Sequence, residues 1–539
     1  MSASATATAA HRRTATGNSP FTGVGNLLRL AIRRDRVRLT VWIAVLTLMM
    51  VYAPYAIRLA YPEEPQRLAR VNLLKTPAGM MLGGPMFGTK ETDLGVMMAN
   101  ELMLTLIVAT SILAILTVIR HTRAEEESGA AELVLSSVVG RYARTTAALI
   151  LVGALNAILA LTMTLAMAST GFGLVDTAGM CLGVTAVAMV FGAVAAVTAQ
   201  LWRQARTATG AAMATLALAA LVRGVGDVID NSGSALSWFS PIAWAQQMRA
   251  FVELRWWPLG LLVGLAVALI AVAGLLEKRR QYDDGTIPST GERPNAPQIT
   301  GPLSLHLTLQ RGQTIGWSVG LFLGGLTFGS MTKSLMDAAQ DNELIARVFA
   351  AQGNDGVYTT MTQFLAAAAT AYAVGAVLRV HSDEQNGLGE AVLAGAVSRW
   401  QWLLGAAVSA VIGSTMLMFC AGLGNGLGAG LTLGEPATIV RLTLAGLAYV
   451  PALAVMAAVA ALAVALRAPW IGWLAVAFVI TALYLGALLR LPSWLIDLSP
   501  VGQTTAPMDY PVVALIVMLS VAMLLAFGAG WIYRRRDAV

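Results

Sequence analysis

The sequence predicts an all-α polytopic membrane protein with about twelve transmembrane helices, built as two tandem six-helix halves. Its 539 residues are 57% hydrophobic and only 12% charged, with a mean hydropathy of +0.68, which exceeds what a water-exposed surface tolerates. The apolar residues gather in runs of roughly 20, long enough to cross about 30 Å of hydrocarbon as helices. These runs do not alternate as barrel strands would. An internal repeat, offset by about 258 residues, divides them six and six.

The apolar runs define the predicted spans. They cover residues 40–60, 95–119, 145–170, 178–202, 207–222, 258–276, 314–332, 358–379, 402–430, 437–465, 470–489 and 511–532. Residues 26–38 are basic and amphipathic, which fits a helix on the membrane surface or an ordinary juxtamembrane stretch. Cys181 and Cys420 lie inside apolar runs, which indicates buried side chains rather than metal ligands or a disulfide.

The distribution of basic residues predicts the orientation. Sorted by these spans, about 24 of the 36 Lys and Arg residues fall on the side that carries both termini. Positive loops stay in the cytoplasm, so both termini are expected there. The net charge of +7 therefore reflects topology. No nucleic-acid partner is expected, because no soluble segment is long enough to form a basic, aromatic face.

Composition also predicts the domain organisation. Residues 1–25 are small, polar and weakly basic, as in a disordered cytoplasmic tail. The first half is expected over 26–280 and the second over 303–539. Between them, residues 281–302 are rich in Pro, Gly and charge, which predicts a cytoplasmic linker.

The two halves align at several landmarks. Residues 123–142 (RAEEESGAAELVLSSVVGRY) match 381–400 (HSDEQNGLGEAVLAGAVSRW). The matched pairs are Glu126 with Glu384, Gly129 with Gly387, Glu132 with Glu390, Arg141 with Arg399 and, further along, Asp176 with Glu435 and Ser240-Pro241 with Ser499-Pro500. Because each half begins and ends on the same side, an axis along the membrane normal should relate the two halves.

The aligned segment between the second and third span of each half is the most informative one. It is too polar to span, yet it has an apolar side opposite its acidic residues, as in a helix on the inner membrane face. A simple turn would need roughly four residues. An acidic segment kept in both halves suggests a docking surface for a soluble partner, although a helix that only anchors the bundle would look the same.

At these residues the chain resembles the ABC-2 type permease family, the six-helix membrane subunits of ABC exporters. Their loop after the second helix reads loosely as E-x-G-x-x-E-L-L-L and closes in P-V-S-R. A fused chain of this length resembles actinobacterial exporters of polyketide antibiotics of the tetronasin type. The resemblance implies type V exporter-like halves in a bacterial cell membrane, with amphipathic coupling helices at 125–139 and 383–397. The residues it assigns to ATPase docking are Glu126, Glu127, Gly129, Glu132, Arg141, Glu384, Gly387, Glu390 and Arg399.

The energy source is expected on another polypeptide. The sequence contains no G-x-x-x-x-G-K-[ST] phosphate loop, so this chain is expected to be no enzyme and to bind no cofactor. Two coupling helices imply two copies of an ABC ATPase subunit, which would hold the ATP and Mg. By the same resemblance, the cargo would be a hydrophobic small molecule such as a polyketide antibiotic or drug.

The resemblance also implies a substrate path between the halves. Flexible apolar side chains suit bulky hydrophobic cargo, although such side chains more often serve packing. The candidate lining residues are Met49, Met97, Met98, Phe322, Thr359 and Met361.

The sequence disfavours two other functional classes. An ion-coupled 12-helix secondary transporter would bury ionisable residues in mid-span, whereas Arg58, Glu101 and Arg441 fall near outer span ends and Asp227 in an outer loop. A membrane-embedded transferase would need outward-facing clusters, but all four histidines fall on the cytoplasmic side. The Trp-rich outer loops, 223–257 and 490–511, fit re-entrant helices or an aromatic belt.

Overall fold

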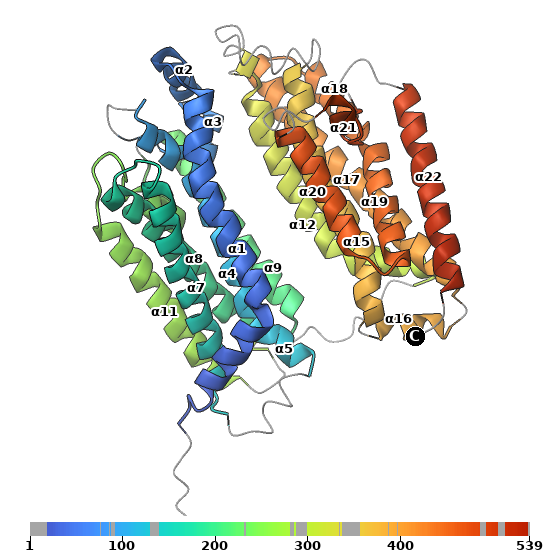
Figure 1. The fold of residues 1–539 in the computed structure, drawn as a ribbon, viewed down its shortest axis with the longest axis horizontal. Coiled ribbons are helices and arrows are strands. Elements are labelled where there is room, and N and C mark those ends of the chain that lie inside the picture. Colours follow the sequence, from blue (N-terminus) through green and yellow to red (C-terminus); the bar gives the residue numbers. More distant parts are fainter. Residues whose placement is uncertain are drawn as a thin grey trace, which may run out of the picture. The chain divides into compact units, whose positions relative to one another are not determined.

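The protein is helical throughout the part of the chain that its computed structural model describes (Figure 1). The described residues are 19–75, 77–85, 87, 92–129, 139–230, 233–280, 285–286, 299–333, 335–336, 356–385, 387–395, 397–485, 492–504 and 512–536. They form two compact units, Met1–Arg293 and Pro294–Val539. The division falls inside the segment 281–302 that the sequence marks as a linker.

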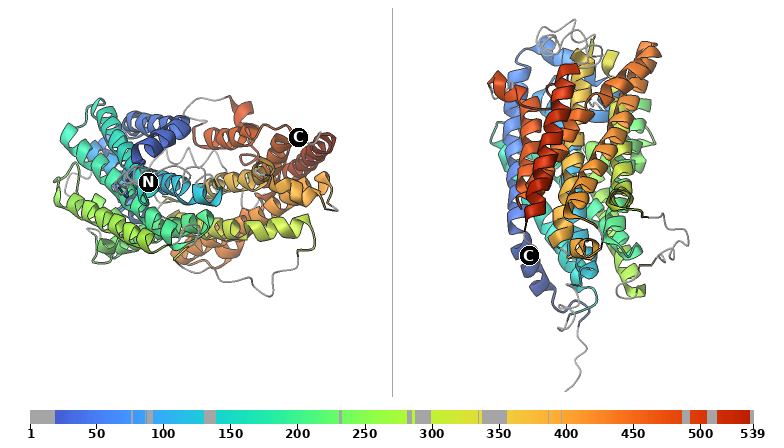
Figure 2. Two further views of the ribbon diagram at one scale, coloured as in Figure 1. Left: turned by 90° about the horizontal axis from the view of Figure 1, so that it is seen from below. Right: turned by 90° about the vertical axis from the view of Figure 1, so that its right-hand side faces the viewer.

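In its described residues, the first unit contains six long helices joined by short ones. The long helices are α1 (Val24–Ala60), α4 (Leu94–His121), α7 (Ala143–Ala168), α8 (Leu174–Leu201), α9 (Ala205–Ile229) and α11 (Trp257–Arg279). The short ones are α2 (Glu64–Leu74), α3 (Pro77–Gly83), α5 (Arg123–Glu127), η1 (Ser237–Phe239) and α10 (Pro241–Gln246). The long helices run side by side and roughly parallel (Figures 1 and 2). At the centre, α8 packs against α4, α7 and α11, which explains why small and apolar residues occupy most of its length.

The second unit repeats this arrangement with its own variations. Its elements are α12 (Pro302–Ser330), α15 (Gly356–Gln385), α16 (Leu388–Leu393), α17 (Arg399–Leu433), α18 (Ala437–Leu447), α19 (Val450–Ala465), α20 (Trp470–Leu485), α21 (Ser493–Asp497) and α22 (Val512–Arg535). The predicted span 437–465 is divided into α18 and α19, just before Pro451. Proline favours the first turn of a helix and disrupts a helix interior.

Within the described residues, ten stretches of helix are long and apolar enough to cross a membrane, and they match ten predicted spans. The chain is therefore a polytopic all-α membrane protein. The other two predicted spans are also helical. Of these, α20 has 16 residues before the described residues stop at 485, and α12 has 29 residues but is less apolar than the ten.

Close packing explains the lower apolarity of α12. A Cβ atom on Gly329 would clash with the backbone oxygen of Asn425 in α17, and one on Gly325 would clash with that of Ala421. The facing positions in α17, Gly424 and Gly428, meet the backbone of α12 in the same way. Small residues spaced four apart let two helices approach backbone to backbone. Here glycine takes positions that a hydropathy scale expects to be filled by large apolar side chains.

The described residues do not contain the separate surface helix that was one prediction for the start of the first unit. Residues 26–38 do not form a separate surface helix, because α1 runs without a break from Val24 to Ala60. Arginine is a good helix former, and no glycine or proline interrupts the chain between 26 and 38. The described chain before α1 is also ordered against the loop preceding α7, where the backbone N–H of Gly140 donates to Thr22 O at 2.9 Å.

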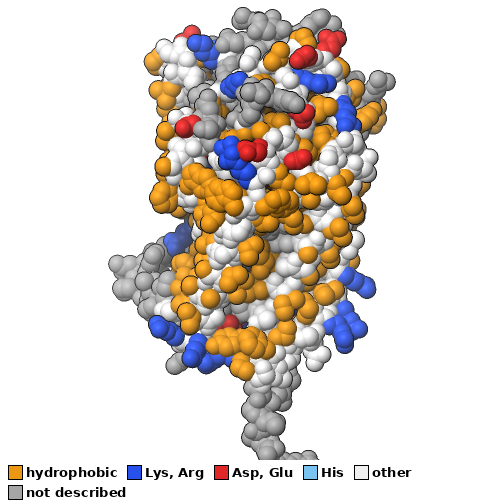
Figure 3. All heavy atoms as spheres, turned by 90° about the vertical axis from the view of Figure 1, so that its left-hand side faces the viewer, with side chains coloured by type: hydrophobic (Ala, Val, Ile, Leu, Met, Phe, Trp, Pro, Cys, Tyr) orange, Lys and Arg blue, Asp and Glu red, His pale blue; other side chains and the backbone are white. Residues whose placement is uncertain are grey.

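Charge is distributed unevenly along the first unit. On the face shown in Figure 3, a band of hydrophobic side chains separates a lower end, where Lys and Arg predominate, from an upper end where acidic and basic side chains mix. We call the lower end, where α1 begins and α4 and α11 finish, the basic end.

Candidate functional site

A buried carboxylate fixes the acidic segment at the basic end of the first unit. Glu126 in α5 is 7% exposed and pairs with three arginines, Arg123, Arg144 and Arg280, each with an N–O distance of 2.5 Å. We call these four residues the first anchor. Arg123 begins α5, Arg144 lies in the first turn of α7, and Arg280 follows α11 directly. A single carboxylate thus joins α5 to the start of α7 and to the end of α11, which is distant in sequence.

The first anchor also reaches the end of α8. The Arg123 side chain is fully buried, and its Nε donates to the backbone oxygen of Trp202 at 2.7 Å. Nearby, the Thr145 hydroxyl donates to the buried carboxylate of Glu277 at 3.0 Å. Charges removed from water are tolerated only when they are paired and hydrogen-bonded, which these contacts provide. The carboxylate of Glu126 therefore points into the unit instead of toward solvent, and it holds the acidic segment against the helices.

A second network ties the start of α1 to α4 and α5. Asp35 in α1 is 2% exposed, and its carboxylate lies 2.9 Å from His121 Nε2 and 3.1 Å from Arg120. The other ring nitrogen of His121 lies 3.2 Å from the carboxylate of Glu125, which Arg34 also contacts at 3.2 Å. The beginning of α1, the end of α4 and α5 are therefore linked through charged side chains.

Two other candidate residues of the first copy lie nearer the surface. Glu127 is exposed and accepts a hydrogen bond from the backbone N–H of Ala205 at 2.9 Å, at the first residue of α9. A carboxylate suits a helix N-terminus, where backbone N–H groups lack partners. Gly129 has a φ of +73°, which favours glycine, and ends the helical turn. Glu132 and the rest of 130–138 lie outside the described residues.

The second unit has a counterpart that we call the second anchor, formed by Glu384, Tyr533 and Arg536. The Tyr533 hydroxyl donates to Glu384 at 2.5 Å, and an Arg536 nitrogen lies 3.4 Å from the same carboxylate. Glu384 is in the last turn of α15, and Tyr533 and Arg536 lie at the end of α22. The last helix of each unit is thus tied to the aligned acidic segment.

Paired positions adopt paired geometry. Gly129 and Gly387 have φ values of +73° and +72°, and each backbone N–H donates to the carbonyl three residues earlier, at 3.1 and 3.0 Å. Arg141 donates to Lys278 O at the end of α11, and Arg399 donates to Arg536 O at the end of α22. The repeat seen in the sequence is therefore a repeat of local structure and of tertiary contacts.

The two copies also differ. In the repeat alignment, His381 and Trp402 stand where the first anchor has Arg123 and Arg144. Glu384 is consequently paired with one arginine instead of three. The predicted helix over 383–397 is wrong as one continuous element, because α15 extends to Gln385 and a new helix, α16, begins at Leu388. Gly387, in the left-handed conformation, is close to this break, and Glu390 lies within α16.

Most candidate residues of the substrate path are packed inside their own units. Met97, Met98 and Thr359 are fully buried and Met361 is 7% exposed. Met49 and Phe322 are partly exposed. In this conformation the four buried side chains belong to helical cores, and their part in a substrate path stays a prediction.

The opposite end of the first unit contains a buried ion pair. Arg223 and Asp227 lie 3.4 Å apart in α9 and are 1% and 0% exposed. The Ser237 hydroxyl donates to Asp227 at 2.7 Å, while Arg223 donates to Gln246 in α10 at 3.4 Å and to Met81 O in α3. The placement of Asp227 in a loop was wrong, because α9 extends to Ile229.

The Trp-rich loops contain short helices in both units, η1 and α10 in the first and α21 in the second. Exposed tryptophans also occur there, including Trp256, Trp257 and Trp494, so re-entrant and belt interpretations both stay open. Among the residues that the structure describes, no three His, Cys, Asp or Glu side chains come together as metal ligands.

Sequence reasoning found the carboxylates and closing arginines but missed their partners. Asp35, Arg144, Arg280 and Tyr533 carry no local signal, because they meet their partners only through helix packing. His121 could have been found, since it lies four residues before Glu125, the spacing of neighbours on a helix.

Comparison with known proteins identifies the family of this chain. A family profile described as "Multidrug efflux system permease Rv1217c, C-terminal domain" matches residues 299–534. The Multidrug efflux system permease protein Rv1217c of Mycobacterium tuberculosis is 36% identical over 557 residues, covering 98% of this chain and 97% of that protein. The chain therefore belongs to the family of multidrug efflux system permeases represented by Rv1217c.

Proposed function

We propose that the chain is the membrane-spanning permease subunit of an ATP-driven ABC exporter of the ABC-2 type. It effluxes hydrophobic compounds such as drugs or polyketide antibiotics, as its likeness to tetronasin-type exporters suggests. Two copies of an ABC ATPase subunit bind, one at the basic end of the first unit and one at the end of the second unit where α15 and α22 finish. These ends are cytoplasmic together with both termini. ATP and Mg bind to that subunit, and this chain is not an enzyme.

One observation carries the proposal. Each unit has an acidic segment after its second span, and in each the segment is tied to the end of that unit's last helix through a carboxylate and a closing arginine. A partner that moves such a segment also moves the helices fastened to it. The exposed Glu127 in the first segment and Leu388, 60% exposed, in the second are available for contact. The absence of a phosphate loop from the sequence is consistent with ATP binding elsewhere.

The alternative is an ion-coupled secondary transporter. The observation that favours it is the fully buried Arg223–Asp227 pair inside α9, since ionisable residues within membrane helices often belong to ion pathways. The neighbours of this pair offer a structural explanation, because Ser237, Gln246 and Met81 O each form a hydrogen bond with it.

Transport into everted membrane vesicles distinguishes the two functions. Vesicles containing the permease and its co-expressed ATPase should accumulate a fluorescent hydrophobic drug when ATP and Mg are added. A protonophore should leave this uptake unchanged, and vanadate should stop it. Uptake supported by an ion gradient without ATP would instead establish the secondary transporter.

A further inference from the structure

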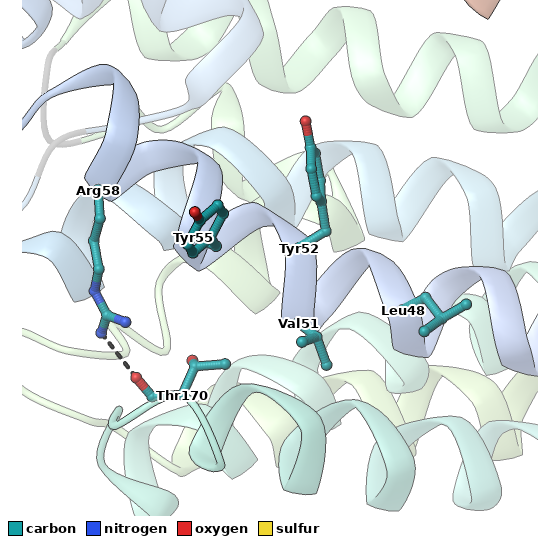
Figure 4. Close-up of a pocket in the computed structure, with 6 residues that line it drawn as sticks. All are labelled: Leu48, Val51, Tyr52, Tyr55, Arg58 and Thr170. Carbon is teal, nitrogen blue, oxygen red and sulfur yellow. Dashed lines mark hydrogen bonds between the residues drawn. The ribbon is translucent and has the colours of Figure 1, made fainter. Parts of the chain in front are cut away.

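A groove on the first unit has no role in the proposed function. It is lined by Leu48, Val51, Tyr52, Tyr55 and Arg58 of α1 and by Thr170, which follows α7 (Figure 4). Its volume is about 570 Å³, and it is open on one side. Sites for small ligands commonly measure about 300–1,000 Å³ and combine apolar walls with a few polar groups. This groove has that composition, with a single charged residue at one end.

The length of the groove matches one leaflet of a bilayer. Leu48 and Arg58 lie ten positions apart in a helix, or roughly 15 Å along its axis. The hydrocarbon of a bilayer is about 30 Å thick, so 15 Å corresponds to one layer of acyl chains. From Arg36, in the basic part of α1, to Arg58 the helix rises roughly 33 Å. Arg58 therefore lies at the membrane surface opposite the basic end, with the groove leading from it toward the bilayer centre.

Two contacts fix the position of the Arg58 side chain and leave some of its N–H donors available to a ligand. One guanidinium nitrogen donates to Thr170 O at 2.8 Å, and the guanidinium lies 5.2 Å from the ring centroid of Phe172 (Figure 4). No carboxylate among the described residues pairs with it, and its other N–H groups donate to no described residue. A planar guanidinium with free donors suits a phosphate group.

The remaining walls suit an acyl chain. Along α1, Tyr55 and Tyr52 lie between Arg58 and the aliphatic Val51 and Leu48 (Figure 4). The side chains of Leu48 and Tyr55 are 65% and 68% exposed. Tyrosine is enriched where a membrane protein passes from hydrocarbon to headgroups. The groove is thus charged at one end and apolar at the other, as a lipid molecule is.

We propose that this groove binds an anionic phospholipid from the leaflet at the Arg58 end. The phosphate pairs with Arg58, and one acyl chain lies along Val51 and Leu48. Charge complementarity favours an anionic headgroup, because the positive charge of Arg58 has no carboxylate partner within the described residues. The bound lipid joins the end of α1 to the chain that follows α7.

Photo-crosslinking in a membrane of known composition tests the proposal. Benzoylphenylalanine replaces Val51 in the full-length chain, which is reconstituted into vesicles of equal amounts of phosphatidylglycerol and phosphatidylcholine. Mass spectrometry after illumination identifies the attached lipid. We expect phosphatidylglycerol to dominate, Arg58→Gln to lower its yield about fivefold, and Arg58→Lys to retain most of it.

A matched control removes the same charge nearby. Arg67 donates to Tyr61 O and Pro62 O at 3.0 and 3.3 Å but does not line the groove, so Arg67→Gln should leave the yield unchanged. Monodisperse elution in detergent shows that each variant is folded. Equal labelling of both lipids, or equal yields with and without Arg58, would overturn the proposal. So would attachment to another segment of this chain, or displacement of the lipid by a transported drug, which would make the groove a cargo site.

Discussion

Arg280 and Glu126 are 154 positions apart in the chain, yet their side chains meet at 2.5 Å in the first anchor. The contact connects the end of the first unit's last helix with the acidic segment after its second span. Because Arg123 and Arg144 contact the same carboxylate, Glu126 forms ion pairs with several elements at once.

Removing this carboxylate should destabilise the protein. We expect Glu126→Gln to cost about 3 to 5 kcal/mol, because it leaves three arginines around an uncharged side chain in a buried site. Glu127→Gln is the control, since that exposed neighbour retains an oxygen that can accept from Ala205, and it should change stability by under about 0.5 kcal/mol. Recovery of monodisperse protein after graded heating in detergent measures both. Equal heat resistance of the two variants would contradict the assigned role of the first anchor.

Glycine packing between α12 and α17 should tolerate no added methyl group. We expect Gly329→Ala to destabilise the second unit by about 1 to 3 kcal/mol, because its Cβ would clash with Asn425 O. In the same helix, a Cβ on Gly320 would meet nothing within 4 Å, so Gly320→Ala should be neutral or stabilising by up to about 1 kcal/mol. Both are compared by thermal unfolding in the same detergent, and a stable Gly329→Ala variant would show that the helices are not this close.

The buried Arg223–Asp227 pair offers a double-mutant test. Asp227→Asn alone should cost about 3 to 5 kcal/mol, because Arg223 stays buried with its charge uncompensated. Replacing both residues with apolar ones, Arg223→Met with Asp227→Leu, should recover most of that loss. Transport by the double variant decides its function: normal drug efflux means that the pair is structural, whereas loss of efflux in a stable protein would support an ion pathway.

Charge reversal in the acidic segments tests partner docking. We expect Glu132→Lys and Glu390→Lys each to reduce recovery of the ATPase subunit in a pull-down by about tenfold and to abolish drug resistance, with normal membrane insertion. The control is Glu64→Lys in the first turn of α2, at the other end of the first unit. If both variants exported drug normally, the docking assignment of these segments would be wrong.

The purified chain should hydrolyse no ATP by itself. Phosphate release in detergent or in vesicles should stay at the background rate, because the sequence has no loop to hold the phosphates of ATP. Adding the ATPase subunit should raise it. Hydrolysis by the permease alone at the rate of a complete transporter would refute the assignment of ATP hydrolysis to a separate subunit.

Hydropathy and repetition were sufficient to predict much of this fold. Ten spans follow directly from the length of apolar runs, because only such runs can cover the hydrocarbon of a bilayer. The predicted span 314–332 is helical as part of α12, and it is less apolar than the ten because Gly325 and Gly329 contribute backbone contact instead of apolar surface. The separate surface helix predicted at 26–38 is absent from the described residues, because these arginine-rich but helix-favouring residues continue α1.

The repeat alignment predicted local geometry at the candidate site, whereas the assignment of these residues to partner docking stays a prediction. The alignment paired Gly129 with Gly387 and Arg141 with Arg399 correctly, and their backbone geometry and contacts agree. The break after Gln385 had a visible signal, since glycine commonly ends a helix. The arginines around Glu126 could not be foreseen, because their meeting depends on how α5, α7 and α11 pack, which no local pattern encodes.

The unequal anchors have a consequence for how each half can change over evolutionary time. Four side chains in the first unit share one set of ion pairs, so substitution at any of them disturbs the pairing of the others. Glu384 in the second unit contacts only one tyrosine and one arginine. A single substitution there therefore breaks fewer contacts. After duplication, the second copy is therefore the one that a single substitution disturbs less.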